Sequence, residues 1–552
     1  MKTLNKILAV TLAAASVTSC ADLDAVNQSY YVTPEDKQEV AAMDPAKAQA
    51  AVTGCFSNFN VCQGVYSEHF DFGYPAIMLG LDLQALDVQC KYTGYNWHLS
   101  WERYDSPNYD SEQSYMMWRT MYNQIFTTNA LIASADLETT NKELQFYNAQ
   151  GYALRAYDYF VLAQSYAFNY AGHEDDLCVP IITNENSEQA AADGAPRATV
   201  KEVYEQILKD INTAIKLLDA SGLQPSQVIS SKPKRMMSAA AAYGLRARIN
   251  LVMHNYKEAA DDAQTAIEKF TGKPYSMDEL SRPTFSSLDD AAWMWGIAIA
   301  ETDRVVTTGI VNWPSFMVTF CDGYVGNGAW KYCGYQIYDY LSSSDVRKGW
   351  FLDDNYKSSH INAEEQAYID QFIPADGPIY GTADSSSSLF PQTNVKFASY
   401  QNVLLQSVNS NDIPLMRIEE MYLIQAEATG MDSDNLGQGK QLLETFVKTY
   451  RNPNYTCTAS SVEEFVNECW MQRRAEFWGE GLSFFDIKRL GKPVDRANNR
   501  TCYSYRFNIP ADSPVLNYCV PREEVNANPL IPLDKAGVIS DSPLPFHEDI
   551  DY

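Results

Sequence analysis

Hydrophobic residues recur every three or four positions over several long segments of the chain, which is the spacing of helices that bury one face. This spacing is found in residues 113–134, 144–168, 237–253 and 256–270. It is clearest after Thr199, where the Thr199 to Glu202 segment has the form of a capping box. The apolar positions that follow fall on one face, at Val203, Ile207, Ile211, Ala214 and Leu218. The chain is therefore predicted to be mainly α-helical.

Two blocks of helices are predicted. The first covers about residues 40–272, and the second covers about 414–490, with one helical stretch from Pro414 to Tyr450 and another that opens at a capping box, Ser461 to Glu464. Near the end of the first block, small and aromatic residues have the spacing of a tetratricopeptide hairpin. These residues are Ala247, Tyr256, Ala259, Ala263 and Ala266. The blocks are expected to form one scaffold of helical hairpins.

The segment between the two blocks, residues 273–413, mostly lacks helical periodicity. It contains glycine, proline, serine and many aromatic residues, including the serine-rich run 383–388. An irregular segment of this length is uncommon in a compact protein unless it has a function, and its aromatic content argues against disorder. We expect a loop-rich, ligand-binding insert here and a second irregular segment over residues 491–552.

The N-terminus has the pattern of an export signal. Lys2 and Lys6 precede an apolar run from Ile7 to Ala15, which is too short to span a bilayer as a mature helix. Small residues then precede Cys20, and this arrangement resembles a bacterial lipobox. The resemblance implies that residues 1–19 are removed and that Cys20 is acylated. A plain secretory signal with an incidental cysteine is the alternative.

The charge narrows the range of partners. Removing residues 1–19 takes away Lys2 and Lys6 but no acidic residue, so the net charge changes from −28 to −30. An acidic protein repels nucleic acid and anionic lipid headgroups. Neutral ligands, cationic ligands and protein partners remain.

The eleven cysteines do not form a recognisable metal or redox motif, because no two of them are spaced as CxxC. Cys55 and Cys62, or Cys321 and Cys333, are close enough in sequence to form a disulfide. Buried free thiols are the alternative for all of them.

Catalytic motifs are also missing from the sequence. It has no HExxH, GxSxG or Walker A pattern, and none of its six histidines is spaced as a metal pair. We therefore expect no enzyme activity and no cofactor. One charged cluster invites a catalytic interpretation, but ion pairing at a helix end explains it better, with Arg474 expected to pair with Glu476 or Glu480. The cluster comprises Arg473, Arg474, Glu476, Glu480, Asp486 and Arg489.

Aromatic residues in the irregular segments are the candidates for ligand binding. Flat rings offer sugars an apolar surface at a small entropic cost, and polar side chains beside them can bind hydroxyl groups. The first candidate group comprises Tyr92, Tyr95, Asn96, Trp97, Trp101 and Tyr104. The second comprises Trp313, Phe316, Trp330, Tyr332 and Tyr335. The alternative is that these rings pack the core of the insert. We expect at least one exposed tryptophan among Trp97, Trp101, Trp313 and Trp330 to bind ligand.

Several motifs, in order along the chain, resemble those of the SusD/RagB family of outer-membrane nutrient-binding lipoproteins. The run from Leu154 to Phe160 resembles the family's "L-R-A-x-x-Y-F", and Arg417 to Ala428 resembles its "R-x-A-E-x-x-L-x-x-A-E-A". Arg473 to Arg489 resembles its "R-R-x-E-x-x-x-E-G-x-x-x-x-D-x-x-R". Further matches are Asp345-x-Arg347 and the closing segment from Val520 to Pro529.

The resemblance implies a single unit from residue 20 to 552, with a tetratricopeptide-like scaffold and no catalysis. It implies a lipid-anchored protein at the outer membrane that captures an oligosaccharide and delivers it to a SusC-like TonB-dependent transporter. The repeat hairpins would face the transporter. A peptide-binding uptake protein of the RagB kind and a surface adhesin or scaffold remain alternatives.

Overall fold

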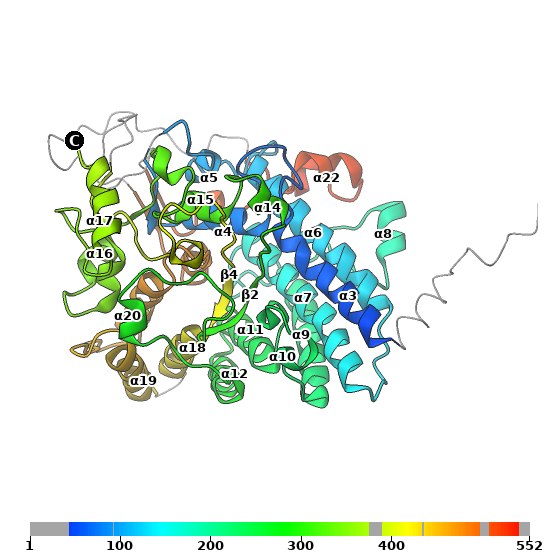
Figure 1. Ribbon diagram of the computed structural model, residues 1–552. Coiled ribbons are helices and arrows are strands. Elements are labelled where there is room, and N and C mark those ends of the chain that lie inside the picture. Colours follow the sequence, from blue (N-terminus) through cyan, green and yellow to red (C-terminus); the bar gives the residue numbers. More distant parts are fainter. Residues whose placement is uncertain (1–43, 92, 375–388, 433–434, 497–506, 540–552) are drawn as a thin grey trace, which may run out of the picture.

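The computed structural model describes residues 44–91, 93–374, 389–432, 435–496 and 507–539, and these residues are mainly α-helical (Figure 1). The expected signal peptide, Cys20, Tyr92 and the run 383–388 lie outside the described residues. The helices up to the insert are α3 (Pro45–Ser57), α4 (Tyr74–Gln84), α5 (Leu99–Glu102), α6 (Glu112–Ala133), α7 (Lys142–Tyr166), α8 (Ser187–Asp193), α9 (Val200–Ser221), α10 (Pro225–Val228), α11 (Ala239–Val252) and α12 (Tyr256–Lys269).

The long helices follow the predicted pattern. Helix α9 begins at the predicted capping box, where the Glu202 N–H donates to Thr199 Oγ1 (3.2 Å) and the Thr199 N–H donates to Glu202 Oε2 (2.8 Å). It ends at Gly222, whose φ of 66° suits a residue without a side chain. All five predicted apolar positions of α9 are buried. These features confirm the predicted capping box and apolar face of α9.

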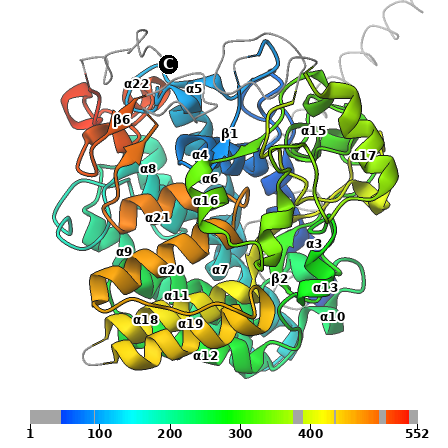
Figure 2. The same ribbon diagram turned by 90° about the vertical axis from the view of Figure 1, so that its left-hand side faces the viewer.

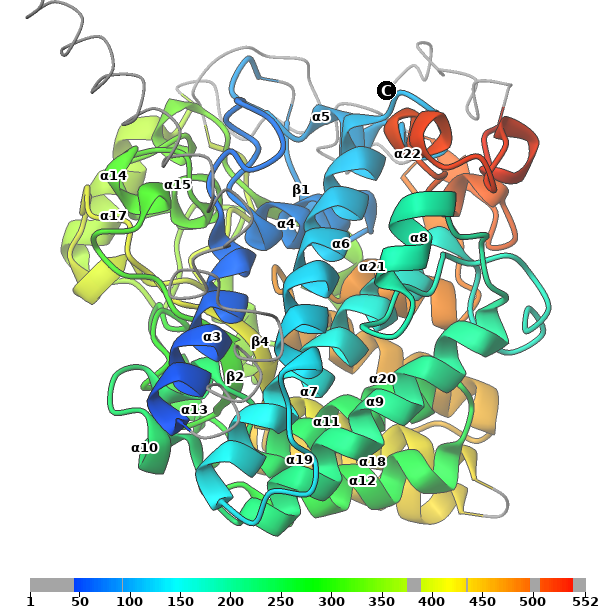
Figure 3. The same cartoon turned by 90° about the vertical axis from the view of Figure 1, so that its right-hand side faces the viewer.

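Consecutive helices pack side by side to form the scaffold. Figure 3 shows α6, α7, α9, α11 and α12 in succession, and α12 packs in turn against α18 (Ile418–Met431). Between α7 and α9, the Arg155 guanidinium donates to both carboxylate oxygens of Asp210 (2.8 and 2.7 Å), and both side chains are buried. The expected scaffold of helical hairpins is therefore present.

The second block continues this stack. Figure 2 shows α18, α19 (Leu436–Tyr450), α20 (Val462–Glu476) and α21 (Ser483–Arg489). The predicted capping box at α20 forms only in part, because Ser461 Oγ accepts the Glu464 N–H whereas Glu464 itself accepts the N–H of Ser460. The helical block predicted from Pro414 begins instead as a strand, β4 (Ile413–Arg417).

Strand β4 closes the base of the insert by pairing antiparallel with β2 (Trp293–Ile297). The two ends of the segment 298–412 therefore lie side by side on the scaffold. Asp412 fixes this junction, since its carboxylate accepts the N–H groups of Leu288 (3.0 Å) and Ile299 (2.8 Å) and pairs with Lys232 (2.6 Å). In the described residues of the insert region the α-helices are short, as its lack of periodicity predicted: α13 (Met277–Leu280), α14 (Arg304–Thr307), α15 (Trp313–Met317), α16 (Tyr335–Tyr340) and α17 (Ala363–Ile369).

A second strand pair joins the insert to the first block. Strand β1 (Val88–Gln89) pairs antiparallel with β3 (Tyr332–Cys333). The C-terminal segment contains β5 (Val494–Asp495), β6 (Asn508–Ile509) and α22 (Arg522–Ala527). Because β1 lies just before the first aromatic group and β3 lies within the second, the fold brings the two predicted ligand-binding regions together.

The cysteines among the described residues are free and buried, at positions 55, 62, 90, 178, 321, 333, 457, 469 and 519. The two suggested disulfides are therefore wrong, and the alternative of buried thiols is confirmed for these residues. Burial raises the pKa of the Cys55 and Cys90 thiols to about 11, so both stay protonated near neutral pH.

Candidate ligand-binding site

One group of aromatic side chains combines residues from both predicted regions and reaches the surface. We call Tyr95, Trp97, His69 and Tyr324 the aromatic cluster. The Trp97 ring stacks on the His69 imidazole, with centroids 4.9 Å apart and planes inclined by 29°. Tyr324 lies 5.8 Å from Tyr95 and meets Trp97 edge-on at 6.4 Å. Tyr95 is 46% exposed, Trp97 and His69 are half-buried, and Tyr324 is buried at 5%.

Buried contacts stabilise the turn that carries Tyr95 and Trp97. The buried Asn96 amide donates to Glu102 Oε1 (2.7 Å), which ties the turn to α5. Trp101 on α5 packs against α4 at Gly80, where a side chain would lie 2.2 Å from the indole nitrogen. Asn96 and Trp101 thus position the exposed rings without being accessible themselves.

Tyr324 reaches the cluster from the insert. Its ring stacks on the buried Phe316 of α15, with centroids 4.7 Å apart, and Phe316 in turn stacks on Phe72 at 5.5 Å. The Tyr324 hydroxyl is hydrogen-bonded to His69 Nδ1. Helices α5 and α15 lie at the same end of the molecule (Figure 1). This end therefore presents the rings of Tyr95, Trp97 and His69, backed by the buried Tyr324 of the insert.

Glu112, at the start of α6, lies within electrostatic range of two other acidic residues. Burial raises the pKa of Glu112, and the negative charges of Glu68 and Asp105 add to this effect. Glu68 immediately precedes His69 in the sequence. Arg103 opposes the rise in the pKa of Glu112 and is itself ion-paired with Asp105 (2.9 Å).

The other predicted ligand-binding rings are buried, except Tyr335. Trp101 is 1% exposed, Trp313 3% and Trp330 0%. Tyr104 and Tyr332 are buried as well, and Tyr335 is half-buried at the start of α16. Trp313 packs edge-on against Phe397 at 4.8 Å, and Trp330 against Phe372 at 5.4 Å. The structure does not present these tryptophans to a ligand, and Trp97 alone of the four reaches the surface.

Sequence reasoning missed His69 and Tyr324. His69 precedes α4, outside both aromatic groups, and Tyr324 follows α15 within the insert. Neither has a spacing that distinguishes it from a core residue. Only the pairing of the two regions in three dimensions identifies them.

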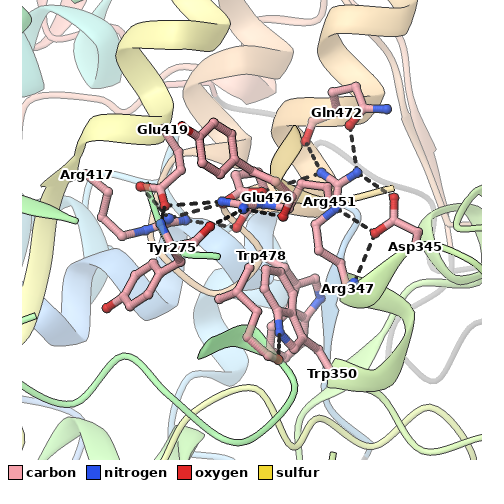
Figure 4. A network of polar contacts seen from close by, with 12 residues as sticks. Tyr275, Asp345, Arg347, Trp350, Arg417, Glu419, Arg451, Gln472, Glu476 and Trp478 are labelled. Carbon is pink, nitrogen blue, oxygen red and sulfur yellow. Dashed lines mark hydrogen bonds and ion pairs between the residues drawn. The ribbon is translucent and has the colours of Figure 1, made fainter. Parts of the chain in front are cut away.

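The charged cluster around Arg473 is a buried ion network. Glu476 accepts from Arg451 (2.6 Å) and Arg417 (3.1 Å), and Arg347 lies 3.5 Å away (Figure 4). These four side chains are 0% exposed. Burial opposes the ionisation of Glu476, but the three guanidinium groups outweigh it and hold the pKa of this carboxyl well below its usual range. A network closed to solvent fits the predicted structural role.

Arg474 does not pair with Glu476 or Glu480, so that expectation is wrong. It forms an ion pair with Asp87 (2.6 Å), just after α4, and both side chains are 2% exposed. Glu480 instead contacts Arg417 (2.8 Å) and Lys396 (2.7 Å). The three carboxylates of the cluster, on Glu476, Glu480 and Asp486, thus each have a buried cationic partner.

Neither metal sites nor membrane spans are found in the part of the chain that the structure describes. Within it, no three histidine, cysteine or acidic side chains are grouped so that they could hold a metal ion. The helices of the same residues all lack the combined length and apolar content that a bilayer-spanning helix needs.

Comparison with known families gives two matches. The family described as "Starch-binding associating with outer membrane", SusD-like, matches residues 83–251, and the SusD family, SusD_RagB, matches residues 346–515. These segments contain three of the motifs noted in the sequence, at residues 154–160, 417–428 and 473–489. The chain belongs to the SusD/RagB family.

Solved structures share the fold. A SusD-like carbohydrate-binding protein from Bacteroides vulgatus has a TM-score of 0.69 at 20% identity, over 90% of this chain and 99% of that one. Surface glycan-binding protein A from Bacteroides thetaiotaomicron, in complex with laminarihexaose, has a TM-score of 0.62 at 15% identity, over 90% and 99%. A laminarin-binding SusD-like protein has a TM-score of 0.60 at 18% identity, over 88% and 97%. A search of curated proteins gives no match.

Proposed function

We propose that this protein binds a neutral oligosaccharide at its surface through the aromatic cluster. The observation that carries the proposal is the exposure of Tyr95 beside the half-buried Trp97, with the buried Tyr324 of the insert packed against both rings. Aromatic faces suit the C–H faces of sugars, and the half-buried His69 places a polar ring beside them for hydroxyl groups. The glycan-bound and laminarin-binding relatives support the same ligand class.

The protein acts in this proposal as a binding protein without catalysis. It is anchored to the outer membrane by acyl groups on Cys20, faces the exterior, and delivers its ligand to a SusC-like TonB-dependent transporter. The family descriptions support an association with the outer membrane. The lipobox-like sequence before Cys20 supports the anchor.

A glycan array tests the ligand class most directly. The soluble form, starting after Cys20, should bind one or a few related neutral glycans, and Trp97→Ala should lose this signal. Phe126→Ala is the matched control, because Phe126 is an aromatic residue 73% exposed on α6, outside the aromatic cluster.

Two results would redirect the proposal. Binding of peptides but not of glycans would favour an uptake protein of the RagB kind. Binding of neither, together with adhesion to surfaces by the anchored protein, would favour an adhesin.

A further inference from the structure

A second, polar cleft lies in the insert, and it shares no residue with the aromatic cluster. It has a volume of about 530 Å³ and opens between α13, α16 and residues 343–360. Helix α16 lies below α17 in Figure 1, whereas α5, next to the aromatic cluster, lies at the top. The volume is within the range of pockets that hold small ligands.

His360 lines this cleft and lacks a polar partner. The residue is 7% exposed, and its Nδ1 is enclosed without a hydrogen bond to any described residue. Its ring lies flat against Gly349, where an added Cβ would be 2.3 Å from Nε2. Burial lowers the pKa of His360 to about 4, so the imidazole is neutral near pH 7, with one donor and one acceptor nitrogen.

Each charged side chain that lines the cleft already has a hydrogen-bond or ion-pair partner. Lys348 Nζ donates to the carbonyls of Tyr338 (2.9 Å) and Leu341 (2.7 Å). Asp345 is paired with Arg347, and Lys357 is paired with Asp370. The Asp353 carboxylate accepts the N–H groups of Asn355 and Lys357. Among the described residues Lys348 and Asp353 have no ion pair, but the two acidic and two basic side chains that line the cleft balance, so it has no net charge to favour an ionic ligand.

Serine hydroxyls line the same cleft as His360. Ser343 and Ser359 are exposed, and their hydroxyls form no hydrogen bond within the described part of the chain. Ser358 Oγ donates to the Gly349 carbonyl (2.5 Å) and accepts the His360 N–H (3.0 Å), which fixes the loop. The cleft therefore offers free hydroxyls and a fixed neutral imidazole.

We propose that this cleft is a second saccharide site, which takes a neutral sugar unit through hydrogen bonds from its hydroxyls to His360, Ser343 and Ser359. The side chains of Phe351 and Pro453 supply apolar wall for the sugar C–H groups. The inference rests on the proposed function for its ligand class. A protein with two sites would bind a long glycan at two points, which raises avidity without new contacts at either site.

Nuclear magnetic resonance of the soluble protein with ¹⁵N-labelled histidine tests the site. The His360 signal is assigned with His360→Gln, and D-glucose, D-galactose, D-mannose and D-xylose are each titrated, with glycerol as the polyol control. At least one sugar should shift the signal saturably, and it should do so in Trp97→Ala as well. Combined Ser343→Ala and Ser359→Ala should raise the half-saturating concentration at least threefold, whereas Ser57→Ala, an exposed serine on α3, should not change it.

The proposal is overturned if no sugar shifts the His360 signal more than glycerol does. It is also overturned if the shift disappears in Trp97→Ala or is unchanged in the double serine variant. Failure of the proposed function has a different signature, which is the absence of Trp97-dependent binding on the glycan array.

Discussion

Arg474 and Asp87 form an ion pair 2.6 Å long that joins α20 to the residues after α4, across 387 positions of sequence. Ser483 Oγ (2.8 Å) and the Trp478 indole nitrogen (2.6 Å) donate to the same aspartate, to its carboxylate and its carbonyl respectively. Asp87 directly precedes β1, which leads into the turn bearing Tyr95 and Trp97. The Arg473 to Arg489 motif thus stabilises the start of the segment that carries the proposed binding surface.

Arg474→Ala should lower the free energy of unfolding by about 3–5 kcal/mol, because it leaves a buried carboxylate without its cation. Urea denaturation measures this loss. Arg522→Ala is the control, since its pair with Asp110 is half exposed and should contribute about 0–1 kcal/mol. The fraction of Arg474→Ala that remains folded should bind glycan normally. Normal stability with lost binding would make the network a ligand site.

Asp158 provides a test of pH dependence. Its carboxyl group on α7 is 0% exposed, and neither oxygen has a hydrogen-bond partner among the described residues. Burial raises its pKa well above the ordinary 3.8, so the folded protein holds a proton that the unfolded chain releases. The stability that comes from holding this proton is therefore fully present below about pH 4. It is lost as the pH rises through the folded-state pKa of Asp158.

Asp158→Asn removes this ionisation. It should raise the free energy of unfolding at pH 8 by about 1–3 kcal/mol and flatten its dependence on pH. Asp210→Asn is the opposing control, because Asp210 is paired with Arg155 and its loss should destabilise the protein. Thermal melts from pH 5 to pH 8 measure both. A lower melting temperature for Asp158→Asn at every pH would contradict the assignment.

Tryptophan truncation separates core rings from surface rings. Trp330→Ala should cost about 3–5 kcal/mol of stability, because the indole is fully buried. Trp97→Ala should cost clearly less, since its ring is half-buried. Denaturation curves of the two variants give the comparison directly. Equal losses would mean that Trp97 is also a core residue.

Cys20→Ala should abolish lipidation and release the protein from the membrane fraction, because acyl chains provide the anchor. Metabolic labelling with a fatty-acid probe measures the first effect, and fractionation measures the second. Cys62→Ala, at a buried free thiol, is the control and should be labelled like the wild type. Equal labelling of Cys20→Ala would refute the lipoprotein assignment.

The sequence was sufficient to predict elements whose signals are local. The capping box at Thr199 and the apolar face of α9 depend on residues within one helix, and both are present. The partner of Arg474 was predicted wrongly because Asp87 lies in a distant segment, whereas Glu476 and Glu480 are its near neighbours in sequence.

The candidate site was predicted only in part for the same reason. Trp97 and Trp330 both occur in irregular aromatic segments, yet one reaches the surface and the other fills the core. Burial depends on how the insert folds back through β1 and β3, and no single segment encodes that pairing. The meeting of Tyr324 with Trp97 likewise follows only from the tertiary structure.

Calorimetric titration of the strongest array glycan into wild type, Trp97→Ala and Phe126→Ala tests the central claim most directly. The aromatic cluster predicts that Trp97→Ala weakens binding at least tenfold, about 1.4 kcal/mol, while the protein stays folded and Phe126→Ala binds as wild type. Unchanged affinity in Trp97→Ala would contradict the claim. So would an equal loss in both variants.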